Sequence, residues 1–228
     1  MTTRRVNLNT ESVDNYLKAI FTLGGPDEER VTSTSLAERL GVAPASITNM
    51  LQKLAASPTP LVEYESRRGV RLSAAGRRRA LEILRHHRLL ETFLYEVLDY
   101  PIEEVHDEAE RLEHFISERL EEHIDAKLGR PKFDPHGHCI PALDGKMSTQ
   151  NSKPLTDLKV DGKFVVDSVA DDDAALLKKL KAHGVTPGAR LQVRSTSYEE
   201  FVLRVGGISR ALRLPRSHAG AVRIRSSD

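Results

Sequence analysis

Residues 35–55 read SLAERLGVAPASITNMLQKLA, and residues 61–73 read LVEYESRRGVRLS. In the first stretch, Gly41 ends one helical pattern and Pro44 begins another, which predicts two helices joined by a short turn. In the second stretch, two alternating segments flank an Arg-Arg-Gly tip, which predicts a β-hairpin. A helix-turn-helix followed by a basic hairpin is the pattern of a winged helix.

The segment before these stretches predicts a further helix. Apolar residues recur at helical spacing from Thr10 to Leu23, and residues 24–26 (GGP) end the pattern. Ser35 and Glu38 have the spacing of a capping box at the start of the next helix.

The third helix of a winged helix enters the major groove of DNA, and the hairpin touches phosphates. The polar side chains available for these contacts are Ser46, Thr48, Asn49, Gln52 and Lys53 on the helix, and Arg67 and Arg68 on the hairpin. Helix pairs with a hairpin also occur in protein-interaction modules, and polar residues on a helix are often only solvated. The pattern by itself leaves that alternative open.

The net charge of +1 is the sum of three differently charged segments. Residues 1–81 carry 12 basic and 8 acidic side chains, residues 82–147 carry 8 and 16, and residues 148–228 carry 14 and 9. Such asymmetry indicates segments with different partners. Seven of the nine histidines lie between His86 and His138, inside the acidic segment, and this combination is typical of a metal site.

Length and composition argue against disordered, membrane-spanning and secreted disulfide-bonded proteins. A chain of 228 residues allows one large domain or two to three small ones, and 39% hydrophobic residues argue against general disorder. No apolar run approaches the roughly 20 residues of a membrane span, and no apolar signal segment follows the first residues. The single cysteine, Cys139, cannot form an internal disulfide, so we expect a cytoplasmic protein.

Within the acidic segment, apolar spacing predicts one helix over residues 81–98 and another over roughly residues 102–128. The second helix carries four ligand-type side chains at offsets 0, 4, 7 and 8, which fall on one stripe at about 100° per residue. The candidate ligands are His87 and Glu91 on the first helix, and His106, Glu110, Glu113 and His114 on the second. Solvated faces of amphipathic helices are the alternative. Imidazole and carboxylate without thiolate suit Mn²⁺ or Fe²⁺.

Four more stretches carry a family resemblance: SVDNYLKAIFTL (12–23), HHRLLETFL (86–94), VHDEAERLEHFIS (105–117) and PHGHCIPAL (135–143). With the two stretches quoted first, they make the chain similar to the metal-dependent transcriptional repressors related to the diphtheria toxin repressor and the manganese transport regulator. The resemblance covers nearly the whole chain.

This resemblance implies two neighbouring metal sites. The first would hold His87, Glu91 and His106; the second would hold Glu110, Glu113 and His114, completed from the first helix by Asn15 or by the adjacent Asp14. Glu110 stands where iron-type members have Cys and manganese-type members have Glu, which favours Mn(II), with Fe(II) as the alternative. Lys18 stands where manganese-type relatives can have a further Glu, which argues against a close pair of manganese ions.

The resemblance also implies which residues of the third helix face the bases. These are Ala43, Pro44, Ala45, Ser46 and Asn49. Their small apolar members suit contacts with thymine methyl groups, although Ala43 cannot cap the helix.

The C-terminal segment predicts a small barrel after a linker at residues 148–158. Strand patterns occur at 162–169, 189–194, 200–205 and 221–225, with one helix at 174–183. The segment resembles the SH3-like (FeoA-type) domain of iron-type members, which lends ligands to the first metal site. Here the acidic candidates are Asp171, Asp172 and Asp173, of which Asp173 completes our predicted ligand set. Helix capping is the equal alternative. The positive charge of the segment either neutralises the acidic segment or assists DNA binding.

The sequence therefore predicts a mainly α protein with a winged helix at 1–75, a helical dimerisation and metal-binding domain at 76–147, and an SH3-like β-barrel at 159–228. The predicted function is a homodimeric, Mn(II)- or Fe(II)-dependent regulator of metal homeostasis genes that binds a palindromic operator and is not an enzyme. One alternative is a metal-dependent phosphohydrolase, because His87, His106-Asp107 and Asp125 superficially match a His…His-Asp…Asp pattern. Another is a winged-helix protein whose acidic patch is only a dimer surface.

Overall fold

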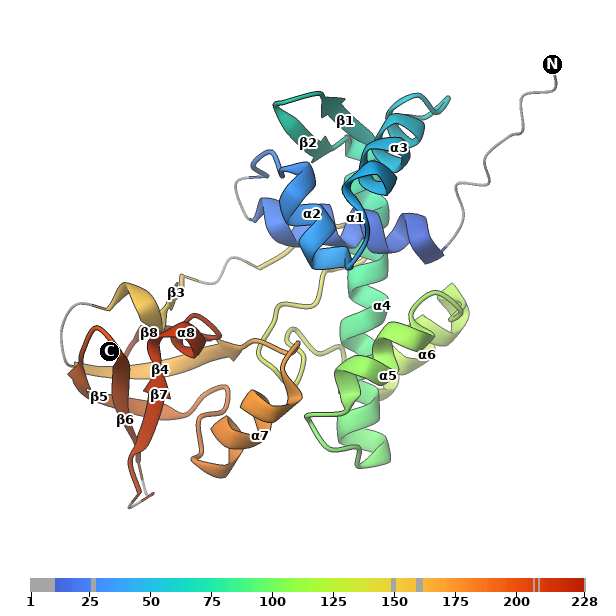
Figure 1. Ribbon diagram of the computed structural model, residues 1–228. Coiled ribbons are helices and arrows are strands. Elements are labelled where there is room, and N and C mark those ends of the chain that lie inside the picture. The colour runs from blue at the N-terminus through green and yellow to red at the C-terminus, as the bar shows by residue number, and fades with distance from the viewer. Residues whose placement is uncertain are drawn as a thin grey trace. The chain divides into compact units, whose positions relative to one another are not determined.

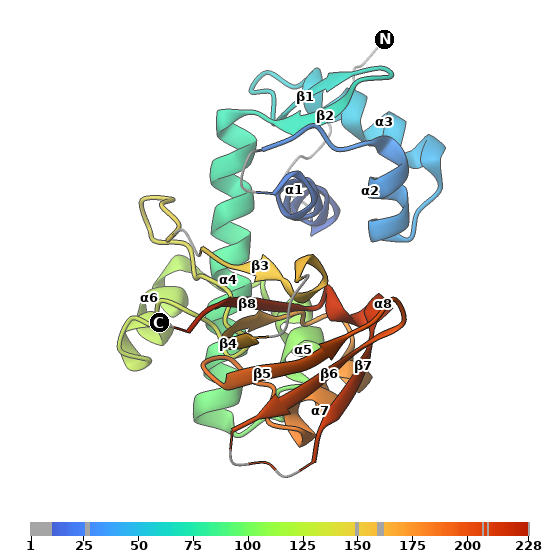
Figure 2. The ribbon, with the colours of Figure 1, turned by 90° about the vertical axis from the view of Figure 1, so that its left-hand side faces the viewer.

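The computed structural model describes residues 11–25, 28–148, 151–158, 162–206, 208 and 210–227 (Figures 1 and 2). Parts of the predicted linker (149–150) and of the predicted domain starts (1–10 and 159–161) lie outside these ranges. The chain divides into two compact units, one of residues 1–86 with 141–145, and one of residues 87–140 with 146–228.

The first unit is a winged helix. Its elements are α1 (Glu11–Gly24), α2 (Ser33–Leu40), α3 (Pro44–Ala55), β1 (Val62–Glu65), β2 (Gly69–Leu72) and the first half of α4 (Ala74–Leu98). The strands β1 and β2 pair in antiparallel register around a tip at residues 66–68. The core is apolar, and Leu17, Leu36 and Leu51 are fully buried. The three predicted helices and the hairpin are confirmed.

Local chemistry sets where these helices begin. The predicted capping box is wrong in detail, because Thr32 is the N-cap of α2 and its Oγ1 accepts a hydrogen bond from the Ser35 backbone N–H. The N-cap of α3 is Ala43, which supplies no side-chain hydrogen bond; Pro44 at the first position favours the helix instead.

The second unit begins with the helical module, which we define as residues 87–140. It contains the second half of α4, α5 (Val105–Leu112) and α6 (Glu118–Lys127). The predicted single helix over 102–128 is therefore wrong. Ser117 breaks it by capping α6, where its side chain accepts from the Leu120 backbone N–H. Glu113 and His114 consequently lie in the turn after α5.

The sheet module, which we define as residues 151–227, completes the second unit. Its antiparallel sheet has the strand order β3-β8-β4-β5-β6-β7. The strands are β3 (Lys153–Pro154), β4 (Gly162–Val169), β5 (Arg190–Thr196), β6 (Glu200–Val205), β7 (Leu212–Pro215) and β8 (Val222–Ser226); the helical elements are η1 (Leu155–Asp157), α7 (Ala174–Ala182) and α8 (Arg216–Ala219). Three of these elements were not predicted from the sequence. β3 and η1 fall in the predicted linker, and β7 was not recognised as a strand.

Side chains from both helices and strands close the core of the sheet module. Leu176 and Leu180 of α7 pack with Leu191 of β5 and Phe201 of β6. Successive side chains of a strand point to opposite faces of the sheet, so the residues next to these buried ones lie on the outer face. Within the described residues, no helix is both long enough and apolar enough to cross a membrane.

Candidate metal centre and nucleic-acid interface

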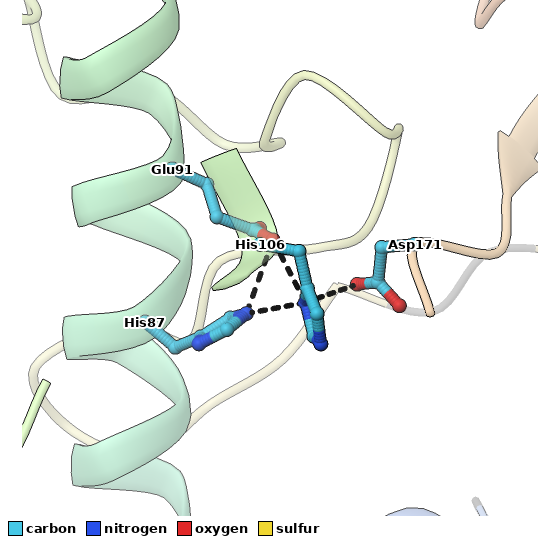
Figure 3. Close-up of side chains that lie close together, drawn as sticks. All are labelled: His87, Glu91, His106 and Asp171. Atoms are coloured by element: carbon cyan, nitrogen blue, oxygen red, sulfur yellow. Dashed lines mark hydrogen bonds and ion pairs between the residues drawn. The ribbon is translucent and has the colours of Figure 1, made fainter. Parts of the chain in front are cut away.

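Three side chains of the helical module converge in a buried cluster (Figure 3). His87 and Glu91 lie one turn apart on α4, and His106 lies at the start of α5. His87 Nε2 is 3.1 Å from Glu91 Oε1 and 3.2 Å from His106 Nδ1, and His106 Nδ1 is 3.3 Å from Glu91 Oε1. The structure thus brings together the three residues predicted for the first metal site.

An aspartate of the sheet module joins this cluster. Asp171 lies between β4 and α7, and its Oδ2 is 3.8 Å from His106 Nδ1 (Figure 3). Asp173, which we had predicted for this role, caps α7 instead, because its Oδ1 accepts a hydrogen bond from the Leu176 backbone N–H at 2.9 Å. The acidic run therefore reaches the cluster through its first member.

A tight loop at residues 134–138 approaches the cluster from another side. Asp134 Oδ1 accepts hydrogen bonds from the backbone N–H groups of His136 and His138, both at 2.9 Å. Gly137 has φ 88°, and a Cβ atom there would lie 2.2 Å from the carbonyl oxygen of Asp167 on β4. Only glycine fits this close approach, which sets the positions of both histidines.

The two loop histidines face the carboxylates of the cluster. His136 is fully buried, with Nε2 3.2 Å from the Ile102 carbonyl oxygen and Nδ1 3.6 Å from Glu91 Oε1. If Nε2–H donates to this carbonyl oxygen, Nδ1 faces Glu91: a protonated ring donates to the carboxylate there, and a neutral ring presents its lone pair, as in many metal-binding histidines. His138 Nδ1 is 3.4 Å from Asp171 Oδ2. Together with Asp134, the two histidines form a second group of three candidate ligands.

Charge pairing dominates the electrostatics of the cluster. Burial opposes ionisation of Glu91, yet the charge of His87 and hydrogen bonds from the nearby histidines hold its pKa well below the ordinary value. Burial would likewise lower the pKa of His138, but hydrogen bonds to Asp134 and Asp171 raise that pKa to about 10.

Glu91 also has unused coordination capacity. Its Oε2 atom is buried and accepts no hydrogen bond from any described residue. A buried carboxylate oxygen without a donor is costly, and a metal ion would satisfy it. The donor set of imidazole nitrogens and carboxylate oxygens fits a divalent ion such as Mn²⁺ or Fe²⁺.

Two of the residues predicted for the second metal site, Glu110 and Glu113, form a neighbouring group with His87, whereas His114 lies outside that group. His87 Nδ1 is 2.6 Å from Glu113 Oε2, and Glu110 joins these two in a further candidate group. His114 Nε2 is 3.4 Å from Glu113 Oε1. If Nδ1–H of His87 donates to Glu113, the lone pair of Nε2 is directed to the first cluster. Glu113 can therefore orient His87 as well as bind an ion.

Asp14 and Asn15, the two candidate ligands from α1, lie in the first unit. Asp14 is buried and its Oδ1 accepts a hydrogen bond from Arg79 Nε at 2.6 Å, so its carboxylate already has a cationic partner. The Oδ1 atom of Asn15 is buried, and no described residue donates a hydrogen bond to it. Of the two alternatives, Asn15 has the oxygen that is available for a ligand.

The predicted DNA-facing residues lie on an exposed part of α3. Ala43, Pro44, Ala45, Ser46, Asn49 and Lys53 are exposed. Thr48 is half-buried, and its hydroxyl donates to the Pro44 carbonyl at 3.3 Å, so that group is partly engaged within the helix. The side chains at the start of α3 are short, which leaves room for close approach to base edges.

On the hairpin, the two predicted arginines differ. Arg68 donates to Glu65 at 2.8 Å, which offsets its charge. Arg67 is exposed at the tip with φ 71°, and no described residue pairs with it. Arg67 is therefore the hairpin cation best placed to meet a phosphate.

Three side chains around the metal cluster are absent from the predicted ligands: Asp134, His136 and His138. Asp171 is among the predicted acidic candidates, but Asp173 is the one assigned to the ligand set. The close spacing of one aspartate and two histidines in DPHGH was a usable signal for Asp134, His136 and His138, because the glycine permits a tight turn that keeps the three ligand-type side chains near one another. No local signal distinguishes Asp171 from its two neighbours.

Comparisons with known proteins identify the family and the fold. Three family models match: the iron dependent repressor N-terminal DNA binding domain at residues 9–70, the iron dependent repressor metal binding and dimerisation domain at 73–142, and the FeoA domain at 153–226. The iron-dependent repressor IdeR of Mycobacterium leprae is 29% identical over 94% of this chain and 96% of its own length. The diphtheria toxin repressor of Corynebacterium diphtheriae is 31% identical over 69% of this chain and 66% of its own.

Two solved structures show the same fold. A manganese-dependent transcriptional repressor in complex with manganese is 36% identical, covers 94% of this chain and 99% of its own, and superposes with a TM-score of 0.84. ScaR with bound Zn²⁺ is 30% identical, with the same coverage and a TM-score of 0.79.

Fold, site and relatives together define a metal-dependent, DNA-binding transcriptional regulator with a winged helix, a dimerisation domain and an SH3-like domain. The chain belongs to the family of iron- and manganese-dependent repressors related to the diphtheria toxin repressor. Members of this family are repressors and not enzymes, and nothing in these comparisons favours the phosphohydrolase alternative.

Proposed function

We propose that this regulator responds to Mn²⁺ and represses genes of metal homeostasis, with the metal-loaded homodimer binding a palindromic operator. The observation that carries the proposal is the cluster of His87, Glu91, His106 and Asp171, of which the first two are buried and the others half-buried, in a chain with an exposed recognition helix. His136 supports the cluster through its Nδ1 atom.

The choice of Mn²⁺ over Fe²⁺ rests on the donor atoms. Glu110 and Glu113 supply hard oxygens to the second group, and the one cysteine, Cys139, lies outside all three candidate groups of described residues. The related structure with manganese bound supports the same choice by analogy. Fe²⁺ remains the alternative, because the relatives named above include iron-dependent repressors.

The switch follows from binding linkage. A metal ion that binds the DNA-competent dimer more tightly than other forms shifts the population towards that dimer, and DNA then tightens metal binding by the same factor. The chain contributes the ligands, the orientation of His87 by Glu113, and the buried carboxylate charge of Glu91 that disfavours the metal-free arrangement.

Two experiments test this function. Genomic fragments are captured with the purified full chain without metal, with Mn²⁺ and with Fe²⁺, and the recovered operator is titrated by fluorescence anisotropy. We expect tight binding only with Mn²⁺, and a Glu91→Gln variant that no longer responds to Mn²⁺. Equal operator affinity of the metal-free and Mn²⁺-loaded protein would contradict the proposal. His123→Ala, at an exposed position of α6, is the matched control and should respond normally.

A further inference from the structure

The outer face of the sheet module is strongly basic. Along β5, Leu191 and Val193 are buried in the core, so Arg190 and Arg194 lie on the opposite, exposed face. The same alternation recurs on the neighbouring strands. We define the basic face by the cations that these strands expose: Lys163, Arg190, Arg194, Arg204, Arg213, Arg223 and Arg225.

Strand register places these cations in rows. Lys163 on β4 lies opposite Gln192 on β5, which in turn lies opposite Arg204 on β6. Neighbouring strands are about 4.8 Å apart, so the two cations of this row are roughly 10 Å apart across the sheet. A second row runs Arg225, Val165, Arg190.

Most of this charge is not offset. Glu200 pairs with Arg213, and Asp167 Oδ1 is 3.3 Å from Arg225 Nε. The remaining cations of β4, β5 and β6 have neither a hydrogen bond nor an ion pair to any described residue through their side chains: Lys163, Arg190, Arg194 and Arg204.

The acidic helical module does not neutralise the basic face. Besides the contacts of Asp171 and the close approach of Gly137 given above, Lys181 of α7 is 3.9 Å from Glu103, and the Val169 backbone N–H donates to the His136 carbonyl. None of these described contacts involves a cation of the basic face. Figure 2 looks onto β5, β6 and β7 with α7 behind them, and Figure 1 shows α7 to one side of the same strands. The basic face is thus the side of these strands turned away from α7.

We propose that the basic face binds the phosphate backbone of duplex DNA, as a second and sequence-independent contact besides the winged helix. The outward strand positions between the cations hold Val165, Gln192 and Val202, so this face has no aromatic platform of the kind that single-stranded nucleic acids stack on. Arginines and lysines without aromatic neighbours fit phosphates, which position a protein without reading sequence. DNA that is already bound by the winged helix would be present at high local concentration near the basic face. This part of the proposal rests on the DNA binding of the winged helix.

A charge-matched pair of variants tests the proposal. Arg190→Gln with Arg204→Gln removes two charges from the basic face, whereas Lys178→Gln with Lys179→Gln removes two exposed charges from α7. The Mn²⁺-loaded full chain is titrated into a random-sequence duplex at several KCl concentrations by fluorescence anisotropy. Each phosphate contact contributes about 0.9 to the slope of log K against log salt. We expect the slope of the arginine variant to fall by about 2 and that of the lysine variant to stay unchanged.

Several outcomes overturn the proposal. Equal slopes for the two variants would show that only net charge matters. An unchanged DNA slope for the arginine variant, combined with weaker binding of polyglutamate, would assign the face to an acidic protein partner. As a control for folding, both variants are compared with the wild type by circular dichroism, and matching spectra show that they fold. Failure of the proposed metal response is a separate result, because it would show as wild-type operator binding that is indifferent to Mn²⁺.

Discussion

The sheet module and the helical module both contain an apolar core cluster, but only the helical module buries several charged side chains beside it. In the sheet module, the buried side chains are apolar apart from Ser168, among the described residues. In the helical module, the buried set includes His87, Glu91, Glu113 and His136, with Glu91 and Glu113 at 0% exposure. An apolar core is stable by itself, whereas buried carboxylates need a cation to offset their desolvation. We therefore expect a metal ion to stabilise the helical module and to change the stability of the sheet module little.

The largest effect should come from the apolar core. Phe201 is fully buried in the sheet module, so Phe201→Ala should lower the free energy of unfolding by about 3–5 kcal/mol. The measurement is denaturant unfolding of the metal-free protein, with hydrogen exchange in β5 and β6. Tyr198→Ala, at a side chain that is 94% exposed, should change stability by less than about 0.5 kcal/mol. Equal losses for the two variants would contradict the described core.

Metal should stabilise the helical module selectively. At Mn²⁺ concentrations about 100-fold above Kd, the free energy of unfolding should rise by about 2.7 kcal/mol. Hydrogen exchange should slow in α4 near Glu91 and at the start of α5, while amides in the core of β5 and β6 change little. Glu91→Gln should abolish the gain, and chelation of the metal should reverse it in the wild type. If Mn²⁺ slowed hydrogen exchange equally in both modules, the expectation that metal stabilises only the helical module would be wrong.

The loop at residues 134–138 should link the two modules energetically. Gly137→Ala places a Cβ atom 2.2 Å from the Asp167 carbonyl oxygen, at a φ that itself costs about 1–2 kcal/mol for an alanine. Gly129→Ala has a similar φ of 74° but no atom within 4 Å of the added Cβ, so it isolates the cost of φ. We expect Gly137→Ala to weaken Mn²⁺ binding in isothermal titration and Gly129→Ala to leave it unchanged. Equal Mn²⁺ affinities would show that the loop is not part of the metal centre.

The smallest effect should lie in the winged helix, whose core is apolar like that of the sheet. Thr32→Ala removes the N-cap of α2 and should lower the free energy of unfolding by about 1 kcal/mol, with or without Mn²⁺. Ala43→Ser adds a cap to α3 and should raise it by a comparable amount, as measured by thermal unfolding. A dependence of either change on Mn²⁺ would mean that the metal acts on these helix ends.

Local sequence predicted most of the elements and failed at specific points. The helix over residues 102–128 was predicted as continuous because its apolar periodicity carries across the break. Ser117 ends that continuity only by capping α6, and serine is also tolerated within helices. β3 and β7 escaped prediction because strands of two and four residues give almost no periodic signal.

What the sequence determined by itself is the winged helix, the ligand-type residues on α4 and α5, and the separation of charge into three segments, because each depends on local periodicity or composition. Tertiary structure alone decided that Asp171 and not Asp173 reaches His106, that the loop of Asp134, His136 and His138 meets the same cluster, and that His87 is shared by two groups. These contacts join residues 19 to 65 positions apart, and no local pattern specifies which of several equivalent carboxylates will reach the cluster. The register of the sheet likewise turned a segment of scattered arginines into one basic face, because cross-strand pairing and not sequence spacing sets which side chains are neighbours.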